Sequence, residues 1–167
     1  MSPGDMAARR IESLDSERIS YGLGPMEYPA LVRWVAREEV ASVMVPCLAS
    51  KGFVVTAAAG GTGVRGPVPS SQNQAFGLAT IECRAMYSVE PRLDAPPSEA
   101  QKALVYEYWS DSVIPCVRGR GLTMADLPTR ETWLADPQPM EDYPFGNAEV
   151  EAACPYNVPS QAWLGEG

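Results

Sequence analysis

The chain contains no histidine, which removes the commonest general base at neutral pH. Catalytic arrangements that combine histidine with serine or cysteine are therefore excluded, and so is a zinc site of two cysteines and two histidines. The four cysteines include no Cys-x-x-Cys pair, so an all-cysteine site would lack its usual close ligands. From these gaps we expect no metal, no cofactor and no catalytic residue.

Long apolar runs are also missing. No stretch approaches the roughly 20 apolar residues that span a bilayer, and the N-terminus lacks the basic-then-apolar layout of a signal peptide. Basic residues are few, with 13 Lys and Arg against 21 Asp and Glu and a net charge of −8. Because an acidic chain is repelled by nucleic acid and by anionic membranes, neither is an expected partner. The chain is either cytosolic, or exported by a signal that stands outside this sequence.

What the sequence does contain is enough apolar material for a core. Its 167 residues are 46% hydrophobic and 20% charged. The cysteines are Cys47, Cys83, Cys116 and Cys154. An even number of widely spaced cysteines, in a chain with 16 Pro and 14 Gly, suits two disulfides in an oxidising compartment. The alternative is four buried free thiols, since free cysteine packs like a small hydrophobic residue.

The surroundings of the cysteines are repeated. VPCL at 45–48 matches IPCV at 114–117, and each is followed at the same distance by glycine and a large apolar residue. Cys83 and Cys154 each precede a tyrosine, a valine and a proline. Two tandem copies of one unit explain this pattern. A repeated unit most simply pairs its own cysteines, which selects Cys47–Cys83 and Cys116–Cys154 among three connectivities.

Periodicity and turn residues predict a helix-dominated α+β fold of two related halves. Residues 1–28 are expected to form a polar, partly helical arm, and residues 29–167 one globular domain. The two halves of this domain lie at about 29–95 and 96–160. In the tail at 161–167, Trp163 is expected to pack back onto the domain. Each half has a long helix, a short hairpin or extended segment and a shorter helix, linked by a disulfide.

In the first half, a helix is expected from Pro29, kinked at Pro46 and ended by Gly52. A hairpin follows that turns at Gly60-Gly61, and then a helix capped by Ser70 or Ser71 that ends at about Met86.

In the second half, a long helix is expected from Ser98. It is followed by an extended segment at 122–128, short helices at 129–135 and 147–154, and a proline-rich loop at 136–146 between them.

Charged and glycine-rich stretches give weak functional signals. Glu38 and Glu39 are adjacent, so on a helix their side chains point in different directions. They therefore indicate a solvent-exposed face rather than a catalytic pair of carboxylates. The stretch GGTGVRG at 60–66 favours a hairpin tip over a phosphate site because it lacks the Lys-Ser/Thr end of a P-loop. Lys51, Arg118 and Arg120 follow the Pro-Cys motifs, where positive charge suits a helix C-terminus; anion binding is the alternative.

A set of aromatic and acidic residues makes the candidate binding site. Its members are Tyr106, Trp109, Trp133, Glu141, Asp142, Tyr143 and Phe145. They could form a groove for a glycan, a peptide or a partner protein, with Glu141-Asp142 as a carbohydrate or calcium site. The alternatives are that the aromatic residues complete the core around the second disulfide and that Glu141-Asp142 lies in a surface turn.

Several spaced elements together carry a resemblance. They are CRAMYSVEPRLDAPPSEAQKALVYEYWSDSVIPCVRGRGL, the preceding VPCLASKGF, and the later ETW, YPF and Cys154. Over residues 30–160 the chain resembles a group of uncharacterised exported proteins and lipoproteins of Actinobacteria. The resemblance implies an extracytoplasmic location and disulfides, and no established activity. Those proteins usually begin with a lipoprotein signal and a lipidated cysteine, which residues 1–28 do not contain.

The resulting expectation is a secreted or lipid-anchored domain at the cell envelope that acts by binding or scaffolding. An envelope protein or a small ligand is the expected partner, and membrane association would need a lipid anchor that this chain does not carry. The alternatives are a lipoprotein that binds a small ligand or glycan, and a cell-wall enzyme that depends on carboxylates.

Overall fold

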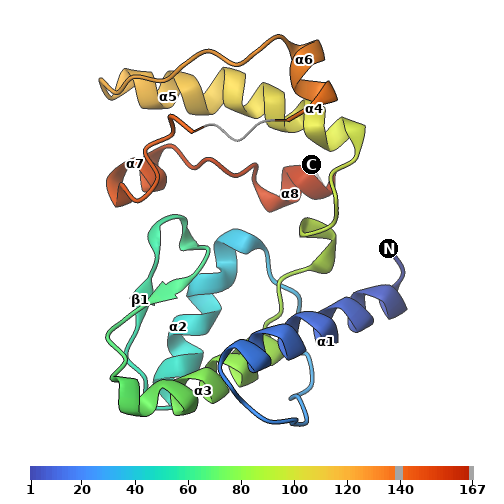
Figure 1. Ribbon diagram of the computed structural model, residues 1–167, viewed down its shortest axis with the longest axis vertical. Helices are drawn as coiled ribbons and strands as arrows, with labels where there is room; N and C mark the ends of the chain where they lie inside the picture. The colour runs from blue at the N-terminus through green and yellow to red at the C-terminus, as the bar shows by residue number, and fades with distance from the viewer. Residues whose placement is uncertain (138–140, 166–167) are drawn as a thin grey trace. The chain divides into compact units, whose positions relative to one another are not determined.

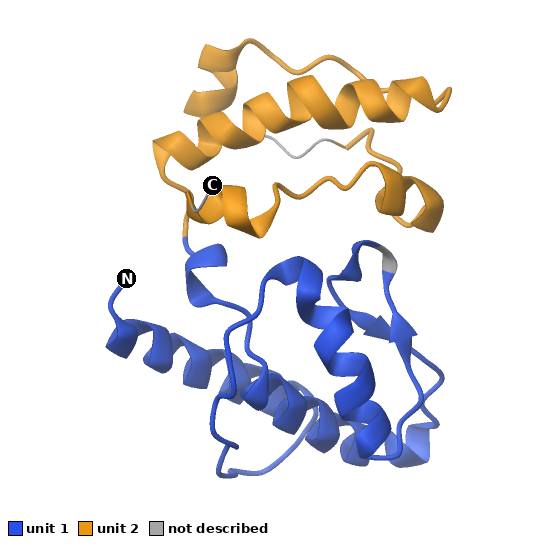
Figure 2. Ribbon diagram, turned by 180° about the vertical axis from the view of Figure 1, so that it is seen from behind, with its two compact units in different colours: residues 1–95 blue, residues 96–167 orange. Residues whose placement is uncertain are grey.

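The computed structural model describes residues 1–137 and 141–165. The chain divides into two compact units, residues 1–95 and 96–167 (Figure 2). The fold is dominated by helices, as the sequence predicted, and the described residues form one sheet of two strands. None of the helices in the described ranges is both long and apolar enough to cross a membrane.

The first unit is built from helices around a small hairpin (Figure 1). In chain order its elements are α1 (Pro3–Ser20), η1 (Arg37–Glu39), α2 (Val40–Ser50), β1 (Thr56–Ala57), η2 (Ala59–Gly61), β2 (Val64–Arg65), η3 (Ser70–Gln72), α3 (Asn73–Met86) and η4 (Pro91–Leu93). Helices α1 and α2 both pack against α3.

Helix α1 begins where the sequence provides both a capping box and a proline in the first turn. The Ser2 backbone N–H donates to the Asp5 carboxylate at 3.0 Å, and the Asp5 N–H donates to the Ser2 hydroxyl at 3.2 Å. Its buried residue, Leu14, packs with Ile81 and Ala85 of α3. The polar N-terminal segment is therefore attached to the first unit through a small apolar contact.

The turn after α1 depends on a glycine in α3. Tyr21 lies directly over Gly77, and a Cβ built on Gly77 would approach the Tyr21 ring to 2.5 Å. Since real side chains do not tolerate such a distance, glycine at position 77 is what allows the Tyr21 side chain to pack this closely on α3.

The prediction of a helix from Pro29 is wrong for its first eight residues, because residues 29–36 are not helical and helical structure begins only at Arg37. Val35 forms a parallel bridge with Val89, so the backbone groups that a helix would use are engaged with a distant segment. The Ala36 N–H donates to the Glu39 carboxylate at 3.0 Å, which fixes the helix start at this point.

Helix α2 continues through Pro46 to Ser50, and Gly52, with φ of 89°, follows its end as predicted. It buries Val40, Ala41, Met44 and Leu48. Cys47 is bonded to Cys83 of α3 with an S–S distance of 1.99 Å, which confirms the first predicted disulfide.

The predicted hairpin is present but small, with Thr56 opposite Arg65 and Ala57 opposite Val64. Gly60 and Gly61, with φ of 73° and 72°, form its tip. The expected serine cap of the next helix is wrong: Ser70 begins the short turn η3 after Pro69, and no side chain caps α3.

In its described residues, the second unit has one long interrupted helix and three short ones. Its elements are α4 (Glu99–Tyr108), η5 (Trp109–Val113), α5 (Ile114–Gly119), α6 (Arg130–Ala135), α7 (Ala148–Ala153) and α8 (Ser160–Leu164). Ser98 caps α4 together with Gln101, so the predicted start of the long helix is confirmed. The bond from the Cys116 sulfur to Cys154, 1.95 Å long, confirms the second predicted disulfide.

The long helix is interrupted by a π-helical turn, η5, immediately before Pro115. The Ile114 N–H donates to the Trp109 carbonyl, five residues earlier, instead of the usual four. Proline has no N–H and its ring collides with the carbonyl four residues back. We attribute the wider turn to this proline.

The short helices at 130–135 and 148–153 were predicted, and Thr129 and Asn147 cap them. Helix α8 was not predicted as a helix. The Gln101 side-chain amide donates to the Trp163 carbonyl at 3.1 Å, so this last segment does return to α4. Of the expected proline-rich loop, residues 138–140 lie outside the described part of the chain.

Candidate functional site

In each of the two acidic pairs, Glu38-Glu39 and Glu141-Asp142, the second carboxylate accepts a backbone hydrogen bond. Glu39 accepts the Ala36 N–H and forms an ion pair with Arg33, and these hydrogen bonds lower the pKa of its carboxyl. Asp142 accepts the Ala125 N–H at 3.4 Å, and Glu141 is exposed. No group of three or more metal-ligating side chains converges among the described residues.

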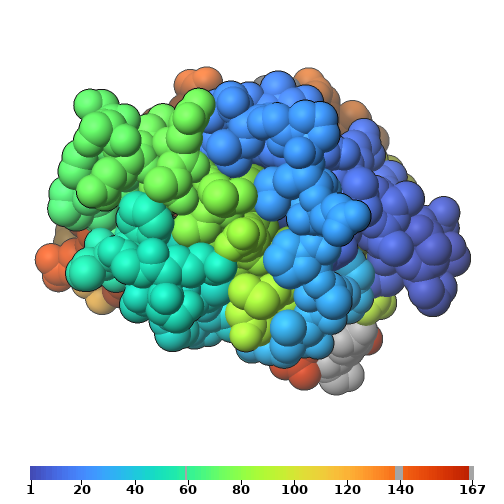
Figure 3. Space-filling model, turned by 90° about the horizontal axis from the view of Figure 1, so that it is seen from below, coloured from blue at the N-terminus to red at the C-terminus, as the bar shows by residue number. Residues whose placement is uncertain are grey.

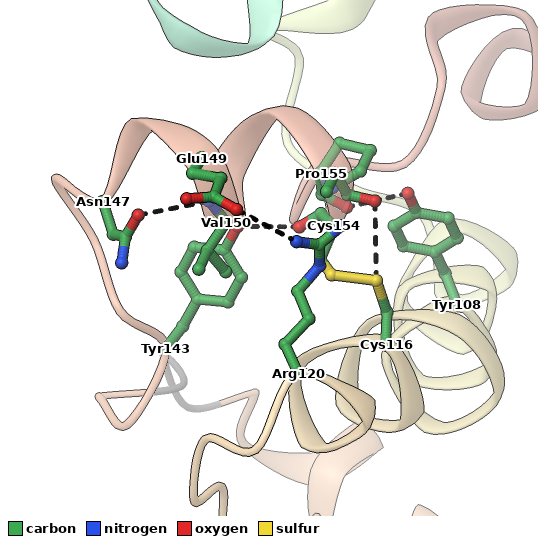
Figure 4. Close-up of a disulfide and its surroundings, with 10 residues drawn as sticks. Tyr108, Cys116, Arg120, Tyr143, Asn147, Glu149, Val150, Cys154 and Pro155 are labelled. Carbon is green, nitrogen blue, oxygen red and sulfur yellow. Dashed lines mark hydrogen bonds and ion pairs between the residues drawn. A yellow bond between two sulfur atoms is a disulfide. The ribbon is translucent and has the colours of Figure 1, made fainter.

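The basic residues that follow the two Pro-Cys motifs form ion pairs with acidic side chains. Lys51 contacts Glu82, and Arg118 contacts Asp126 at 2.8 Å and the Met124 carbonyl at 2.6 Å. The third, Arg120, lies 3.7 Å from the Glu149 carboxylate (Figure 4). These pairs hold the helix ends to neighbouring segments.

The candidate aromatic residues fall into two groups rather than one groove. Tyr106 packs on Trp133 with ring centroids 6.2 Å apart. Trp109 packs edge-on against Tyr143 at 5.7 Å, and Tyr143 against Phe145 at 4.9 Å.

Tyr156 completes the second group, with centroids 5.2 Å from Tyr143 and 5.1 Å from Phe145. Trp109, Trp133 and Tyr143 are buried, while Phe145 is 57% exposed. Three of the five candidate aromatic residues are thus core. Tyr156 was missing from the prediction, although its place two residues after Cys154 was a usable signal.

Tyr143 is held in the core by its hydroxyl as well as its ring. The hydroxyl donates to the Cys154 carbonyl at 2.7 Å. Burial, followed by the negative charge of Glu151, raises the pKa of Tyr143 to about 12. The folded protein therefore favours the neutral, protonated hydroxyl of Tyr143.

We expect the stability of the protein to fall as the pH rises from 10 to 12, in a way that depends on Tyr143. Its folded pKa lies above the unfolded value of 10.0, so its contribution is complete below pH 10 and is lost as the pH rises through about 12. Tyr143→Phe should lose about 1 kcal/mol at pH 7 with the hydrogen bond, and fall less steeply at high pH.

Urea unfolding at several pH values measures both effects. Tyr156→Phe is the matched control, because it removes a hydroxyl with no hydrogen bond among the described residues. An identical decline in Tyr143→Phe and the unaltered protein would contradict the assignment.

A small pocket of about 180 Å³ lies beside the second disulfide. Tyr108, Ser112, Val113, Cys116, Ala153 and Pro155 line it, together with Cys154. The Tyr108 hydroxyl donates to the Pro155 carbonyl at 2.8 Å, and burial raises the pKa of Tyr108 (Figure 4). Among the described residues that line the pocket, Ser112 alone offers a hydroxyl that makes no hydrogen bond.

The larger cavity is a cleft of about 590 Å³ in the first unit, along the line where α1 meets α3 and the segment after it. Helices α1 and α3 pack against one another there. On the face drawn in Figure 3, the blue segment that follows α1 lies beside the green of α3. From α1 the lining includes Arg9, Glu12, Ser13, Ser16, Glu17 and Ser20. Beyond α1 it includes Arg84, Ser88, Val89, Pro91 and Asp94.

The inner part of this cleft is fixed by Arg10. Its Nε donates to the Ala85 carbonyl and the Ser88 hydroxyl, both at 3.2 Å. Its Nη2 donates to the carbonyls of Ala85 at 2.7 Å and Pro29 at 2.8 Å. One guanidinium thus joins α1, the end of α3 and the loop before Val35, and burial lowers its pKa.

A second ion pair lies along the same cleft. Arg84 contacts the Glu17 carboxylate at 3.2 Å, and burial raises the pKa of Glu17 against the opposing effect of Arg84. Arg9, Glu12, Ser13 and Ser16 are exposed at the rim on α1. The cleft therefore combines a rigid polar floor with a rim that carries both signs of charge.

Sequence reasoning missed this cleft entirely, because it treated residues 1–28 as a separate arm. The fold and the cleft define the protein as a disulfide-linked, helix-dominated chain with a polar recess in its first unit. No family model, curated protein or solved structure matches the chain.

Proposed function

We propose that the chain is an extracytoplasmic binding protein whose first unit holds a peptide-like ligand in the cleft between α1 and α3. The observation that carries this proposal is the cleft of about 590 Å³ with its fixed floor and mixed-charge rim. Arg9 and Glu12 offer charges of opposite sign, and Ser13 and Ser16 offer hydroxyls. A peptide, with its own charges and amide groups, matches this lining.

A sugar matches it less well. Carbohydrate sites commonly stack the sugar ring on an aromatic side chain, and the lining described for the cleft includes none. A nucleic acid is disfavoured by the net charge of −8.

The extracytoplasmic setting is supported by the two disulfides, because such bonds persist in oxidising compartments. We further propose secretion or lipid anchoring at the cell envelope of an actinobacterium, with an envelope protein or a small ligand as partner, on the strength of the sequence resemblance. Fractionation of the source cells should find the protein outside the cytoplasmic membrane; recovery as a reduced cytosolic chain would contradict this part.

We also propose that the two units descend from one duplicated segment. In support, Gly52 and Gly121 both have positive φ, and the N–H of the following residue returns to the Leu48 and Val117 carbonyls. The closing cysteines differ, however, since Cys83 lies inside α3 whereas Cys154 follows α7. The proposal therefore rests on the opening motif.

The binding function is tested by adding a mixture of randomised, N-acetylated and C-amidated hexapeptides to ¹⁵N-labelled protein. Amide signals of Ser13, Ser16 and Ser88 should shift, and signals of the second unit should not. Ser13→Trp, which fills the cleft, should abolish the shifts. Ser42→Trp, at an exposed serine outside the cleft, is the matched control. Shifts that survive Ser13→Trp, or that lie elsewhere, would refute the proposed site.

A further inference from the structure

Residues 86–90, from the last residue of α3 to Glu90, lie beside residues 32–35, and one parallel β-bridge joins Val35 to Val89. The Val32 N–H donates to the Met86 carbonyl at 2.9 Å, and the Val35 N–H to the Ser88 carbonyl at 3.0 Å. The Glu90 N–H then donates to the Val35 carbonyl at 3.1 Å. One edge of this segment is thereby paired with residues 32–35.

The other edge of the segment is open at Val89. In an extended chain, successive residues direct their backbone groups to opposite edges, so Val89 faces away from Val35 when Ser88 and Glu90 face toward it. Neither the N–H nor the carbonyl of Val89 makes a hydrogen bond among the described residues. Val89 is half-buried and lines the cleft.

Backbone groups that are buried or half-buried usually make hydrogen bonds. The free N–H and carbonyl of Val89 can therefore accept a ligand as their hydrogen-bond partner. Pro91, two residues further on, has no N–H and begins η4, so the open edge is short. Arg10, also in the cleft, uses Nε and Nη2, whereas its Nη1 makes no hydrogen bond among the described residues.

We propose that the cleft takes an extended peptide as an added parallel or antiparallel strand, whose backbone carbonyl and N–H pair with the Val89 N–H and carbonyl. A further oxygen of the peptide accepts from Arg10 Nη1. This inference rests on the proposed peptide-binding function and specifies how the ligand is held. Because the main chain supplies the central hydrogen bonds, recognition is tolerant of sequence, and the charged rim selects among side chains.

The test follows the Val89 amide in ¹⁵N-labelled protein with two hexapeptide mixtures of the same random composition. One has free backbone amides, and the other is N-methylated at alternate residues in both registers, so it cannot pair as a strand. With the first mixture, the Val89 amide proton should move downfield and its hydrogen exchange should slow at least tenfold. The Val35 and Glu90 amides, already bonded, should keep their protection.

Two results would overturn the added strand. If both mixtures shift the cleft signals of Ser13 and Ser16 equally and Val89 stays unprotected, the cleft binds peptides but not through this edge. If neither mixture shifts any cleft signal, the proposed function fails together with the inference.

The variant Val89→Pro removes the N–H donor without removing a native hydrogen bond, and should lower affinity for the first mixture at least tenfold. Protection of the Val35 and Glu90 amides in Val89→Pro shows whether the ladder itself survives the substitution. Ser42→Trp, at the exposed serine outside the cleft, is the matched control and should keep both the affinity and the Val89 shift. Unchanged affinity in a Val89→Pro variant that keeps the ladder would count against a backbone-centred mode.

Discussion

Replacing Cys116 and Cys154 together by alanine is expected to lower the melting temperature of the second unit by roughly 15 to 30 °C. The bond joins residues separated by 38 positions, and closing a loop of that length is worth about 4 kcal/mol in the chain-entropy model. For units of this size, 1 kcal/mol corresponds to about 4 to 8 °C. Cys154 is also 2% exposed, so its loss removes packing from the core.

Tryptophan fluorescence can assign the loss to a unit. Trp109, Trp133 and Trp163 lie in the second unit and Trp34 in the first, so a Trp34→Phe background reports the second unit. The matched control is the Cys47→Ala, Cys83→Ala pair, whose sulfurs join residues 36 positions apart in the first unit. A melt of the second unit that the Cys116, Cys154 replacement leaves unchanged would show that this bond does not stabilise the fold.

The second large effect is expected from Trp109→Ala, which should cost about 3 to 5 kcal/mol of unfolding free energy. The Trp109 ring is 7% exposed and packs against Tyr143 in the core of the second unit. Phe145 belongs to the same aromatic cluster but is 57% exposed. Phe145→Ala should therefore cost less than about 1 kcal/mol.

Urea unfolding of the two variants, followed by circular dichroism, decides between core and surface roles for these rings. A large loss for Trp109→Ala with a small one for Phe145→Ala supports the core assignment. Equal losses would mean that Phe145 is covered in solution, and that the cluster extends further than these contacts indicate.

Local signals in the sequence predicted much of the fold. Ser98 marks the start of α4 and Gly52 marks the end of α2, because each acts on its immediate neighbours. The disulfide pairing could be predicted for a different reason: the repeated Pro-Cys motif suggested that each cysteine pairs within its own copy.

Features that depend on distant contacts could not be predicted. Residues 29–36 have helical periodicity, but Val35 pairs with Val89, and no local rule weighs that partner. The π-helical turn at 109–113 and helix α8 were missed as well. The cleft is formed because Leu14 and Arg10 attach α1 to α3. The prediction that residues 1–28 form a separate arm therefore could not include it.

Each disulfide begins and ends on the same side of the junction between Ala95 and Pro96. No sulfur bridge therefore ties the two parts of the chain to one another, and the peptide backbone is their sole covalent link. Over evolutionary time, either part could be lost, exchanged or fused to a different neighbour without leaving an unpaired thiol behind. A genome that encodes one part without the other would still encode an even number of cysteines in it.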